Sequence, residues 1–329
     1  MKQKLKNFLS SFPLVSRVLH GQAIILMLHR IAPINPQGLP ENENMKIDPR
    51  NLESFIISAK KEGYRFISLE ELYNNLQTST FKDNKNLVIT IDDGYKDNYT
   101  YGFEIFTRHN IPFCIYLCTH FLSTPNMWWF SLEDFILKHE IINLPLIAQL
   151  SPKQNINSIP KKSQFFLYLR SYILSRLKQD NIKTIMNDLD IPHEIDSYKN
   201  LALSQEEINS MLQSPLFTLG NHTHSHSVLN NLTQQEIKDD ILCANKIITE
   251  TFNIKAEHLA LPFGGKNEID QNHCNFIKTL DFKTIVTTRN GSIYAKHKDF
   301  LHVLPRIFLS NQTNIKNLIK IRKKIFVTY

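Results

Sequence analysis

The sequence predicts an α/β protein built on a parallel sheet or barrel and interrupted by a helical insertion. Short apolar segments rich in β-branched residues alternate with amphipathic segments, as strands and crossover helices do. The alternation stops over about 123–214, where helical periodicity dominates, and resumes afterwards. The chain has 329 residues, 42% of them hydrophobic, which is enough to form a large core.

The elements before the insertion are closely spaced. Strands are predicted where apolar runs are short, at 23–28, 66–69, 87–91 and 113–117. Helices are predicted at 55–61, 69–76 and 99–108. Gly63 lies where a glycine commonly ends a helix.

Within the insertion the sequence predicts helices and no clear strand. The helices are expected at 132–139, 165–177 and 182–189, and Ser204–Glu207 resembles a capping box that opens another. The alternation then continues with strands at 217–219, 259–261 and 284–287. Helices are expected at 234–251, at 269–280 and at the end of the chain.

The net charge of +7 is concentrated at the two ends. Residues 1–20 carry four basic residues and no acid, and residues 311–329 carry five and no acid. We expect a basic amphipathic helix at 1–20, a main domain at 21–310 and a basic helix at 311–329. Such ends suit an anionic membrane surface or nucleic acid, or are simply solvated helices. No recognised nucleic-acid module accompanies them, so no nucleic-acid partner is expected.

Cysteine usage and hydropathy favour a cytoplasmic location with peripheral membrane contact. The four cysteines form no C-x-x-C pair, and Cys114 and Cys118 lie in an apolar stretch. Serines and Pro13 interrupt the apolar segment that a signal peptide needs. No apolar run approaches the roughly 18 residues that span a bilayer.

Two adjacent carboxylates, Asp92 and Asp93, directly follow the strand at 87–91 and precede Gly94. At the carboxyl end of a buried strand such a pair is costly unless something neutralises it. One aspartate can bind a cation while the other acts as a base. The alternative interpretation is a turn, since Asp-Gly is a strong turn signal.

Three histidines fall within five residues after the strand at 217–219. His222 and His226 are four apart, which suits a divalent metal on a helical turn, whereas His222 and His224 would share one face of a strand. A polar surface loop is the alternative. Two histidines and one carboxylate form the ligand set of a hydrolytic zinc site or of an iron oxygenase.

Two further clusters follow strands. Leu261–Gly265 forms a turn that contains Phe263, and His29-Arg30 follows the first strand. All four clusters fall at the carboxyl ends of predicted strands, the edge where parallel α/β folds gather catalytic groups. Trp128 and Trp129 open the insertion, where they either stack on a sugar or belong to the core.

The clusters taken together resemble the NodB-homology polysaccharide deacetylases, carbohydrate esterase family 4. The resemblance rests on Thr90–Gly94, on His222-Thr-x-x-His226 and on Pro262-Phe263-Gly264, and it covers about 23–120 and 215–309. It implies a distorted (β/α) barrel holding one divalent metal, usually zinc, with cobalt or nickel as alternatives. The insertion and the two ends lie outside the resemblance.

The resemblance also implies residue roles. Asp93, His222 and His226 correspond to the metal ligands, and Asp92 to the general base. Thr223 matches a hydroxyl that braces the histidine loop, whereas His224 has no family role and is expected to be structural. The Phe263 backbone N–H corresponds to the donor for the oxyanion.

Two departures from the pattern favour the circularly permuted branch of the family. Ala260 stands where many members have the arginine beside the base, and the late motif that carries the general acid is absent after Leu280. Instead the chain begins its core with Leu26–Ile31, and the branch resemblance assigns the acid role to His29. We expect Arg306 to replace the missing arginine.

The expected function is therefore a metal-dependent deacetylase acting on an N-acetylated sugar of a cell-envelope glycan or its precursor, such as lipopolysaccharide, capsule or a lipid-linked oligosaccharide. Two alternatives stay open at the level of sequence. The same fold also serves hydrolases of O-acetyl esters or non-sugar amides. The second alternative is a catalytically silent glycan-binding module. Such a module would not need a base beside a metal, and the presence of both aspartates and of His29 therefore argues against it.

Overall fold

The computed structural model describes residues 21–144, 153–177, 179–193, 195–315 and 318. The basic helix expected at 1–20 and most of the one expected at 311–329 lie outside the described residues. Within the described ranges, no helix combines the length and the apolarity that crossing a membrane requires.

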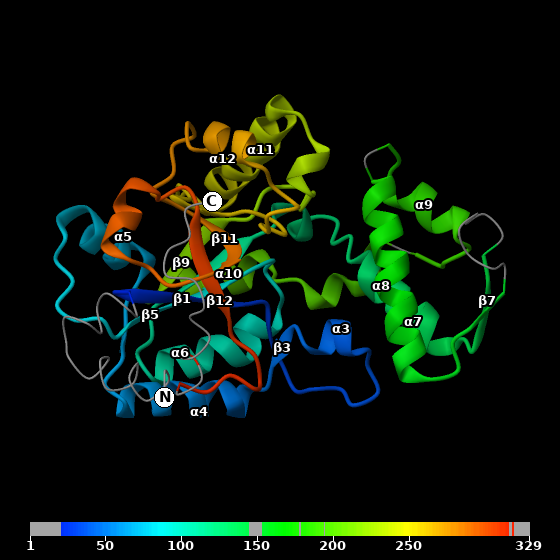
Figure 1. Ribbon diagram of the computed structural model, residues 1–329, viewed down its shortest axis with the longest axis horizontal. Helices are drawn as coiled ribbons and strands as arrows, with labels where there is room; N and C mark the ends of the chain where they lie inside the picture. The colour runs from blue at the N-terminus through cyan, green and yellow to red at the C-terminus, as the bar shows by residue number, and fades with distance from the viewer. Residues whose placement is uncertain (1–20, 145–152, 178, 194, 316–317, 319–329) are drawn as a thin grey trace, which may run out of the picture.

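Seven parallel strands close into a barrel, which confirms the predicted fold class (Figure 1). Around the barrel they are β1 (Ala23–Leu28), β12 (Leu304–Phe308), β11 (Thr284–Asn290), β10 (His258–Ala260), β9 (Phe217–Asn221), β6 (Phe113–Leu117) and β5 (Asn86–Ile91). β5 pairs with β1 along its whole length and closes the circle, whereas β9 and β10 share a single residue pair. The barrel is therefore distorted. The short β4 (Arg65–Phe66) extends the sheet at the start of β5.

Alternation along the strands separates an outer from an inner core. In β1, Ile24, Leu26 and Leu28 pack in the large cluster that includes the surrounding helices, whereas Ala23 and Ile25 belong to a second cluster. This period of two follows from the pleat, which turns successive side chains to opposite faces. A polar residue that directly follows a strand and continues its inward-facing series is therefore directed toward the barrel interior at the carboxyl edge.

Helices cover the outside and the amino-terminal end of the barrel. Those contributing to the outer clusters are α4 (Pro49–Lys61), α6 (Glu104–Arg108), α10 (Gln205–Leu212), α11 (Gln234–Phe252) and α12 (Gln271–Ile277). α5 (Leu69–Thr78) instead packs Leu69, Leu72 and Leu76 into the inner cluster. α5 therefore fills the barrel from the end opposite the carboxyl edge of the strands.

Polar side chains fix where several helices begin. Asp48 caps α4, Ser68 caps α5, and Thr233 forms a complete capping box at the start of α11. The box that the sequence predicts at Ser204 is also complete and opens α10. Local sequence therefore sets the boundaries of the helices that hold the barrel.

Short elements connect these parts. They are β2 (Arg30–Ile31), α3 (Pro40–Glu43), β3 (Lys46–Ile47), and the 3₁₀ turns η2 (Thr119–Leu122), η3 (Ile195–Leu201), η4 (Leu229–Asn231) and η5 (Ala295–Asp299). β2 and β3 form a separate parallel pair. All four cysteines are free, and Cys114 and Cys118 are buried as expected for small apolar side chains.

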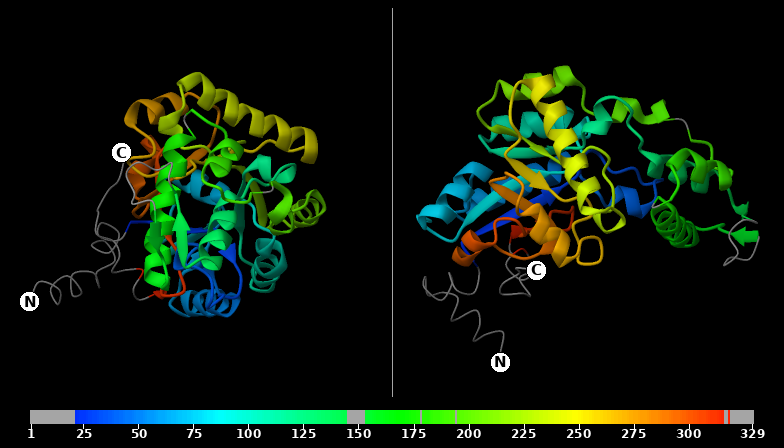
Figure 2. Two further views of the ribbon diagram at one scale, coloured as in Figure 1. Left: turned by 90° about the vertical axis from the view of Figure 1, so that its right-hand side faces the viewer. Right: turned by 90° about the horizontal axis from the view of Figure 1, so that it is seen from above.

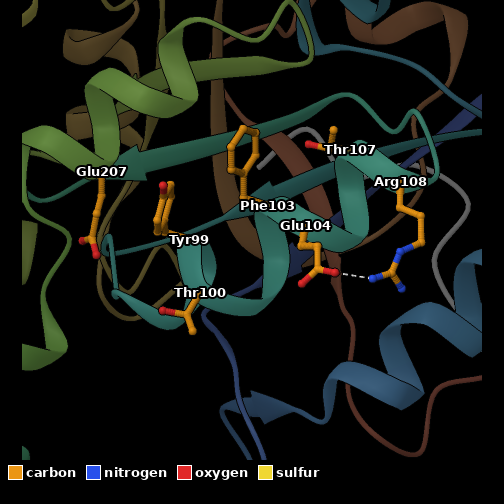
Figure 3. Close-up of a pocket in the computed structure, with 7 residues that line it drawn as sticks. All are labelled: Tyr99, Thr100, Phe103, Glu104, Thr107, Arg108 and Glu207. Carbon is orange, nitrogen blue, oxygen red and sulfur yellow. Dashed lines mark hydrogen bonds and ion pairs between the residues drawn. The ribbon is translucent and has the colours of Figure 1, made fainter.

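The helix predicted at 99–108 begins as a π-helix, η1 (Asn98–Phe103), and becomes α-helical only at Glu104. A shallow pocket borders this segment and α10 on the outside of the barrel (Figure 3). None of the predicted site residues lines it; the lining residues are Tyr99, Thr100, Phe103, Glu104, Thr107, Arg108 and Glu207.

The insertion forms a separate lobe beside the barrel (Figures 1 and 2). It contains α7 (Trp128–Lys138), β7 (Ile141–Asn143), β8 (Lys153–Asn155), α8 (Ile159–Arg176) and α9 (Ile182–Asp188), and its helices share a hydrophobic cluster of their own. The expectation of no strand in this region is wrong, because β7 and β8 form an antiparallel pair. α10, which the sequence places at the end of the insertion, packs Ile208 and Met211 into the barrel core.

Two other differences from the sequence-based elements have physical reasons. The run predicted as a strand at 66–69 divides, because Ser68 caps a helix that begins at Leu69. β12 is not predicted, since its second residue is Pro305, and proline cannot donate to a strand ladder. This strand carries Arg306.

Candidate metal centre

The side chains of the four clusters meet at the carboxyl edge of the barrel. His29 follows β1, Asp92 and Asp93 follow β5, and His222 follows β9. Parallel strands bring these loops to one edge although the residues are up to about two hundred positions apart in sequence. Hydrogen bonds from Asp92 N to Leu28 O and from His222 N to Leu117 O hold the first residue of each loop in register with its neighbouring strand.

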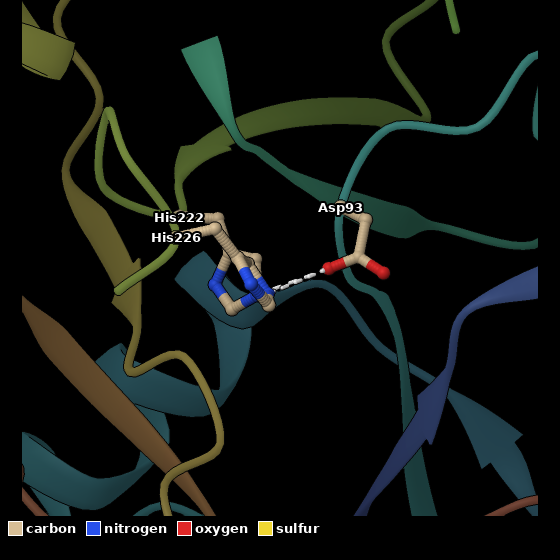
Figure 4. A group of neighbouring side chains, drawn as sticks. All are labelled: Asp93, His222 and His226. Carbon is tan, nitrogen blue, oxygen red and sulfur yellow. Dashed lines mark ion pairs between the residues drawn. The ribbon is translucent and has the colours of Figure 1, made fainter. Parts of the chain in front are cut away.

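Asp93, His222 and His226 form a three-residue cluster with metal-ligand chemistry (Figure 4). The Oδ1 atom of Asp93 lies 3.3 Å from Nε2 of His222 and 3.1 Å from Nε2 of His226. Ligands about 2.1 Å from a tetrahedral metal lie about 3.4 Å apart, so these separations match. The buried Oδ1 has no hydrogen-bond partner among the described residues, as expected of an atom reserved for a cation.

The surrounding loops orient these ligands. Nδ1 of His222 lies 2.9 Å from the carbonyl oxygen of Ala260, so the proton sits on Nδ1 and the Nε2 lone pair faces Asp93. Thr223 Oγ1 accepts a hydrogen bond from the backbone N–H of His226. Asn221 Oδ1 accepts one from the N–H of Thr223. These contacts place the two imidazoles on one side of a tight turn.

Backbone strain is concentrated at the same place. Asp93, Thr223, His226 and Phe263 all have positive φ, between 54° and 76°. Non-glycine residues rarely adopt this conformation, and it is found where the surrounding structure imposes it at functional sites. Gly94, at φ +98°, is required, because a Cβ there would lie 2.6 Å from the Leu117 side chain.

Asp92 is held by Arg306, as the sequence predicts for the arginine that replaces the one absent at Ala260. Both guanidinium nitrogens Nη1 and Nη2 lie 2.6 Å from the two carboxylate oxygens, a bidentate pair. Arg306 also donates from Nε to Thr287 O and from Nη1 to Thr90 Oγ1. The pair is almost completely buried, with exposed side-chain fractions of 0% for Arg306 and 2% for Asp92.

His29 lies beside this pair. Its Nε2 is 4.0 Å from Oδ2 of Asp92, its ring meets Phe308 edge to face, and its buried Nδ1 has no hydrogen-bond partner among the described residues. Burial lowers the pKa of His29, and the attraction of Asp93 and Asp92 offsets this only in part. Burial alone would raise the pKa of Asp92, but Arg306 and His222 outweigh it, so the carboxyl pKa lies below its ordinary value.

The Phe263 loop forms another wall of the site. The ring of Phe263 lies 5.1 Å from the ring of His226, centroid to centroid. Thr288 Oγ1 donates a hydrogen bond to the carbonyl oxygen of Phe263, which fixes the strained turn. Among the described residues the Phe263 backbone N–H has no acceptor, so it is free to bind a substrate oxygen.

The structure brings together all the site residues expected from the sequence, which are His29, Asp92, Asp93, His222, His226, Phe263 and Arg306. His224, the third histidine of its cluster, lies apart from them. Nδ1 of His224 lies 3.0 Å from Thr119 Oγ1, and its ring packs against His120, outside the ligand cluster. Trp128 is buried in the core of the insertion, whereas its neighbour Trp129 is only partly buried. Sequence reasoning missed Arg170 of α8, whose guanidinium lies over the Phe263 ring.

Part of the chain matches a known protein family. Residues 169–285 match the family model described as Polysaccharide deacetylase. No curated protein matches the chain.

Solved structures share the fold at low sequence identity. The Streptococcus pyogenes deacetylase PplD, in complex with acetate, is 17% identical, covers 92% of this chain and 98% of its own, and gives a TM-score of 0.60. A de-N-acetylase from Aggregatibacter actinomycetemcomitans is 13% identical with a TM-score of 0.58, covering 91% and 99%. IcaB from Ammonifex degensii is 15% identical with a TM-score of 0.56, covering 88% and 92%. Residues 169–285 are therefore similar to polysaccharide deacetylases, and the whole chain shares its barrel fold with solved deacetylase structures.

Proposed function

We propose that the chain is a metal-dependent deacetylase that removes the acetyl group from an N-acetylated sugar of a cell-envelope glycan or its precursor. The convergence of Asp93, His222 and His226 with the Asp92–Arg306 pair carries this proposal. A metal-ligand cluster with an adjacent, separately held carboxylate suits hydrolysis rather than binding alone. The acetate in the related PplD structure also suits a site that releases acetate.

The cluster would hold one divalent metal, with zinc the first choice because two imidazoles and one carboxylate leave a coordination position open. When bound, such a metal polarises an acetamide carbonyl and lowers the pKa of water. The separations among Asp93, His222 and His226 support their role as its ligands. Asp92 is held by Arg306 and is not part of the three-residue cluster, so we assign it to proton transfer.

The proton transfers follow from the positions of Asp92 and His29. Asp92 is anionic and its oxygens keep lone pairs beyond those that Arg306 occupies, so it accepts a proton from the attacking water. His29 then donates a proton to the departing amine, which leaves readily only when protonated. Because burial keeps resting His29 largely neutral at pH 7, it must acquire that proton during turnover, and Asp92 at 4.0 Å is the neighbouring source.

The Phe263 backbone N–H would stabilise the negative oxygen that develops on the acetyl carbon. Its lack of an acceptor among the described residues and its rigid turn supply the preorganisation that such a donor needs. The order of the motifs supports placing the chain in the circularly permuted branch, since His29 precedes the aspartates and Arg306 follows the histidines.

The test is acetate release from N-acetylated oligosaccharides by zinc-loaded protein. We expect turnover by the wild type, none by Asp92→Asn, and metal retained in that variant because Asp93 is unchanged. Metal loss in Asp92→Asn would show that the roles of the two aspartates are exchanged. Release of acetate only from O-acetyl esters or non-sugar amides would redirect the proposal to those substrates, and binding without any hydrolysis would favour a glycan-binding module.

The place of action is proposed separately: the cytoplasm, with peripheral contact to an anionic membrane through the basic ends. Cell fractionation and flotation with vesicles containing anionic lipid test this. Absence of the protein from both the cytoplasmic and the membrane fractions would contradict the location. Failure to bind the vesicles at low and high salt would remove the membrane contact.

A further inference from the structure

Arg170 reaches from the insertion to the edge of the metal-ligand cluster. Its guanidinium carbon lies 5.7 Å from the centroid of the Phe263 ring, and that ring in turn packs against the imidazole of His226. A single aromatic ring thus lies between a cation and a candidate metal ligand. Among the described residues, no other residue of the insertion has a hydrogen bond, ion pair or ring contact with residues 261–265.

The insertion is fixed to the barrel on both sides of Arg170 along α8. Ser163 Oγ donates to Glu41 Oε1 at 2.5 Å, and the Leu174 carbonyl accepts from Asn231 Nδ2 at 3.4 Å. Glu41 and Asn231 lie on the barrel side of the contact, in α3 and η4. Arg170 therefore occupies a defined position at the mouth of the barrel.

The charge of Arg170 has no ion-pair partner among the described residues. No carboxylate lies within ion-pair distance, and none of its N–H groups has a hydrogen bond to a described atom, although the side chain is partly buried. Burial lowers the pKa of Arg170, and the more distant Glu268 offsets this only in part. The guanidinium remains protonated, so a partly desolvated positive charge faces the site.

The N–H donors of Arg170 are available to a ligand. The contact with the Phe263 ring is made by the charge of the guanidinium, and none of its N–H groups has a hydrogen bond to a described residue, so these donors remain for an oxyanion. Carboxylates and phosphates are the groups that accept such paired donors. A neutral sugar hydroxyl would leave the charge uncompensated.

We propose that Arg170 binds a carboxylate or phosphate group of the substrate, so that the enzyme selects anionic N-acetylated glycans. This inference rests on the proposed function and specifies its substrate class. The charged group would lie on the acetylated sugar or on its neighbour, since only Phe263 separates Arg170 from His226. Arg170 thereby determines specificity, while the proton transfers remain with Asp92 and His29.

The test compares three probes. They are N-acetylchitotetraose, which is neutral; an oligosaccharide of alternating glucuronate and N-acetylglucosamine, which carries carboxylates; and N-acetylglucosamine 1-phosphate. We expect at least one anionic probe to have the highest kcat/KM. The probe that responds to Arg170 identifies the anionic group as carboxylate or phosphate.

Arg170→Gln should raise KM for the preferred anionic probe by about 10- to 100-fold, the usual effect of losing a charge-assisted hydrogen bond. The KM for the neutral probe should change less than about twofold, a contrast that a purely structural role would not produce. Arg170→Lys should retain part of the effect, since it keeps the charge without the planar fork. Lys161→Gln, an equal loss of charge at an exposed position on the same helix, is the matched control and should change neither KM.

Two results would overturn the inference. The first is that Arg170→Gln lowers kcat equally on all probes, which would mean that the arginine only supports the Phe263 loop. The second is an unchanged KM for every anionic probe.

A binding measurement separates this inference from the proposed function. Isothermal titration of the metal-free full chain with the same anionic probes needs no turnover. If the wild type hydrolyses none of the probes, the proposed function fails for them, yet weaker anionic binding by Arg170→Gln would still support the role of Arg170. Equal binding by the two proteins, or none by either, would refute it.

Discussion

The buried pair of Asp92 and Arg306 makes a quantitative prediction about stability. Arg306→Met removes a cation that satisfies both oxygens of a carboxylate with only 2% exposure. Leaving one member of a buried pair without its partner typically costs about 3–5 kcal/mol of the free energy of unfolding. Asp92→Asn should also be destabilising, because Arg306 then lacks its counter-charge.

The double variant isolates the interaction between the two residues. Combining Asp92→Asn with Arg306→Met removes both charges, so the loss should be smaller than the sum of the two single losses by at least about 2 kcal/mol. Arg306→Lys should fall between wild type and Arg306→Met, because it keeps the charge but cannot bind both oxygens as a fork. All these variants should lose acetate release, since Asp92 is absent or no longer oriented.

The assay is urea unfolding followed by far-ultraviolet circular dichroism, with chelator present so that metal binding does not contribute to stability. Arg306→Lys provides a measurable variant if Arg306→Met fails to fold. The reasoning is refuted if the destabilisation of the double variant equals the sum of the two single losses to within about 0.5 kcal/mol, because the two side chains would then be energetically independent.

Three further predictions concern the metal ligands, the barrel interior and pH. His222→Ala should abolish the binding of one zinc-like ion per chain in elemental analysis of untagged protein, whereas His224→Ala should retain it; zinc bound equally by both would exclude the assigned ligand set. Gly220→Ala should lower the free energy of unfolding by about 1–3 kcal/mol in urea, since the new Cβ would lie 2.5 Å from a buried tyrosine ring. Burial lowers the pKa of His258 from 6.5 to about 4. Between pH 6.5 and 4 the unfolded chain therefore binds a proton at this histidine that the folded protein does not bind. The free energy of unfolding should thus decrease as the pH is lowered through this range, by up to about 3 kcal/mol. The melting temperature of His258→Gln should therefore depend less on pH over this range than that of wild type or of the exposed control His139→Gln.

Local sequence determined the elements and the identity of the candidate ligands. Period-two and helical patterns are set by the geometry of each element, so β1 and β6 have the bounds that their apolar runs predict. Asp93 lies next to its strand, and His222 and His226 lie within one turn, so the sequence itself brings most of the ligand chemistry together. The resemblance of these motifs to a known family then supplied their expected roles.

Tertiary structure decided what depends on distant contacts. The sequence does not predict β12, because Pro305 disfavours a strand, yet pairing with β11 and β1 forms the strand and places Arg306 against Asp92. Spacing alone does not distinguish His224 from His226, and it is the turn with its positive φ values that places the His226 side chain, and not that of His224, beside Asp93 and His222. Arg170 carries no motif, and only the packing of α8 on the barrel brings its charge to Phe263. Such positions depend on side chains far apart in the chain, so the sequence specifies them only through the folded structure.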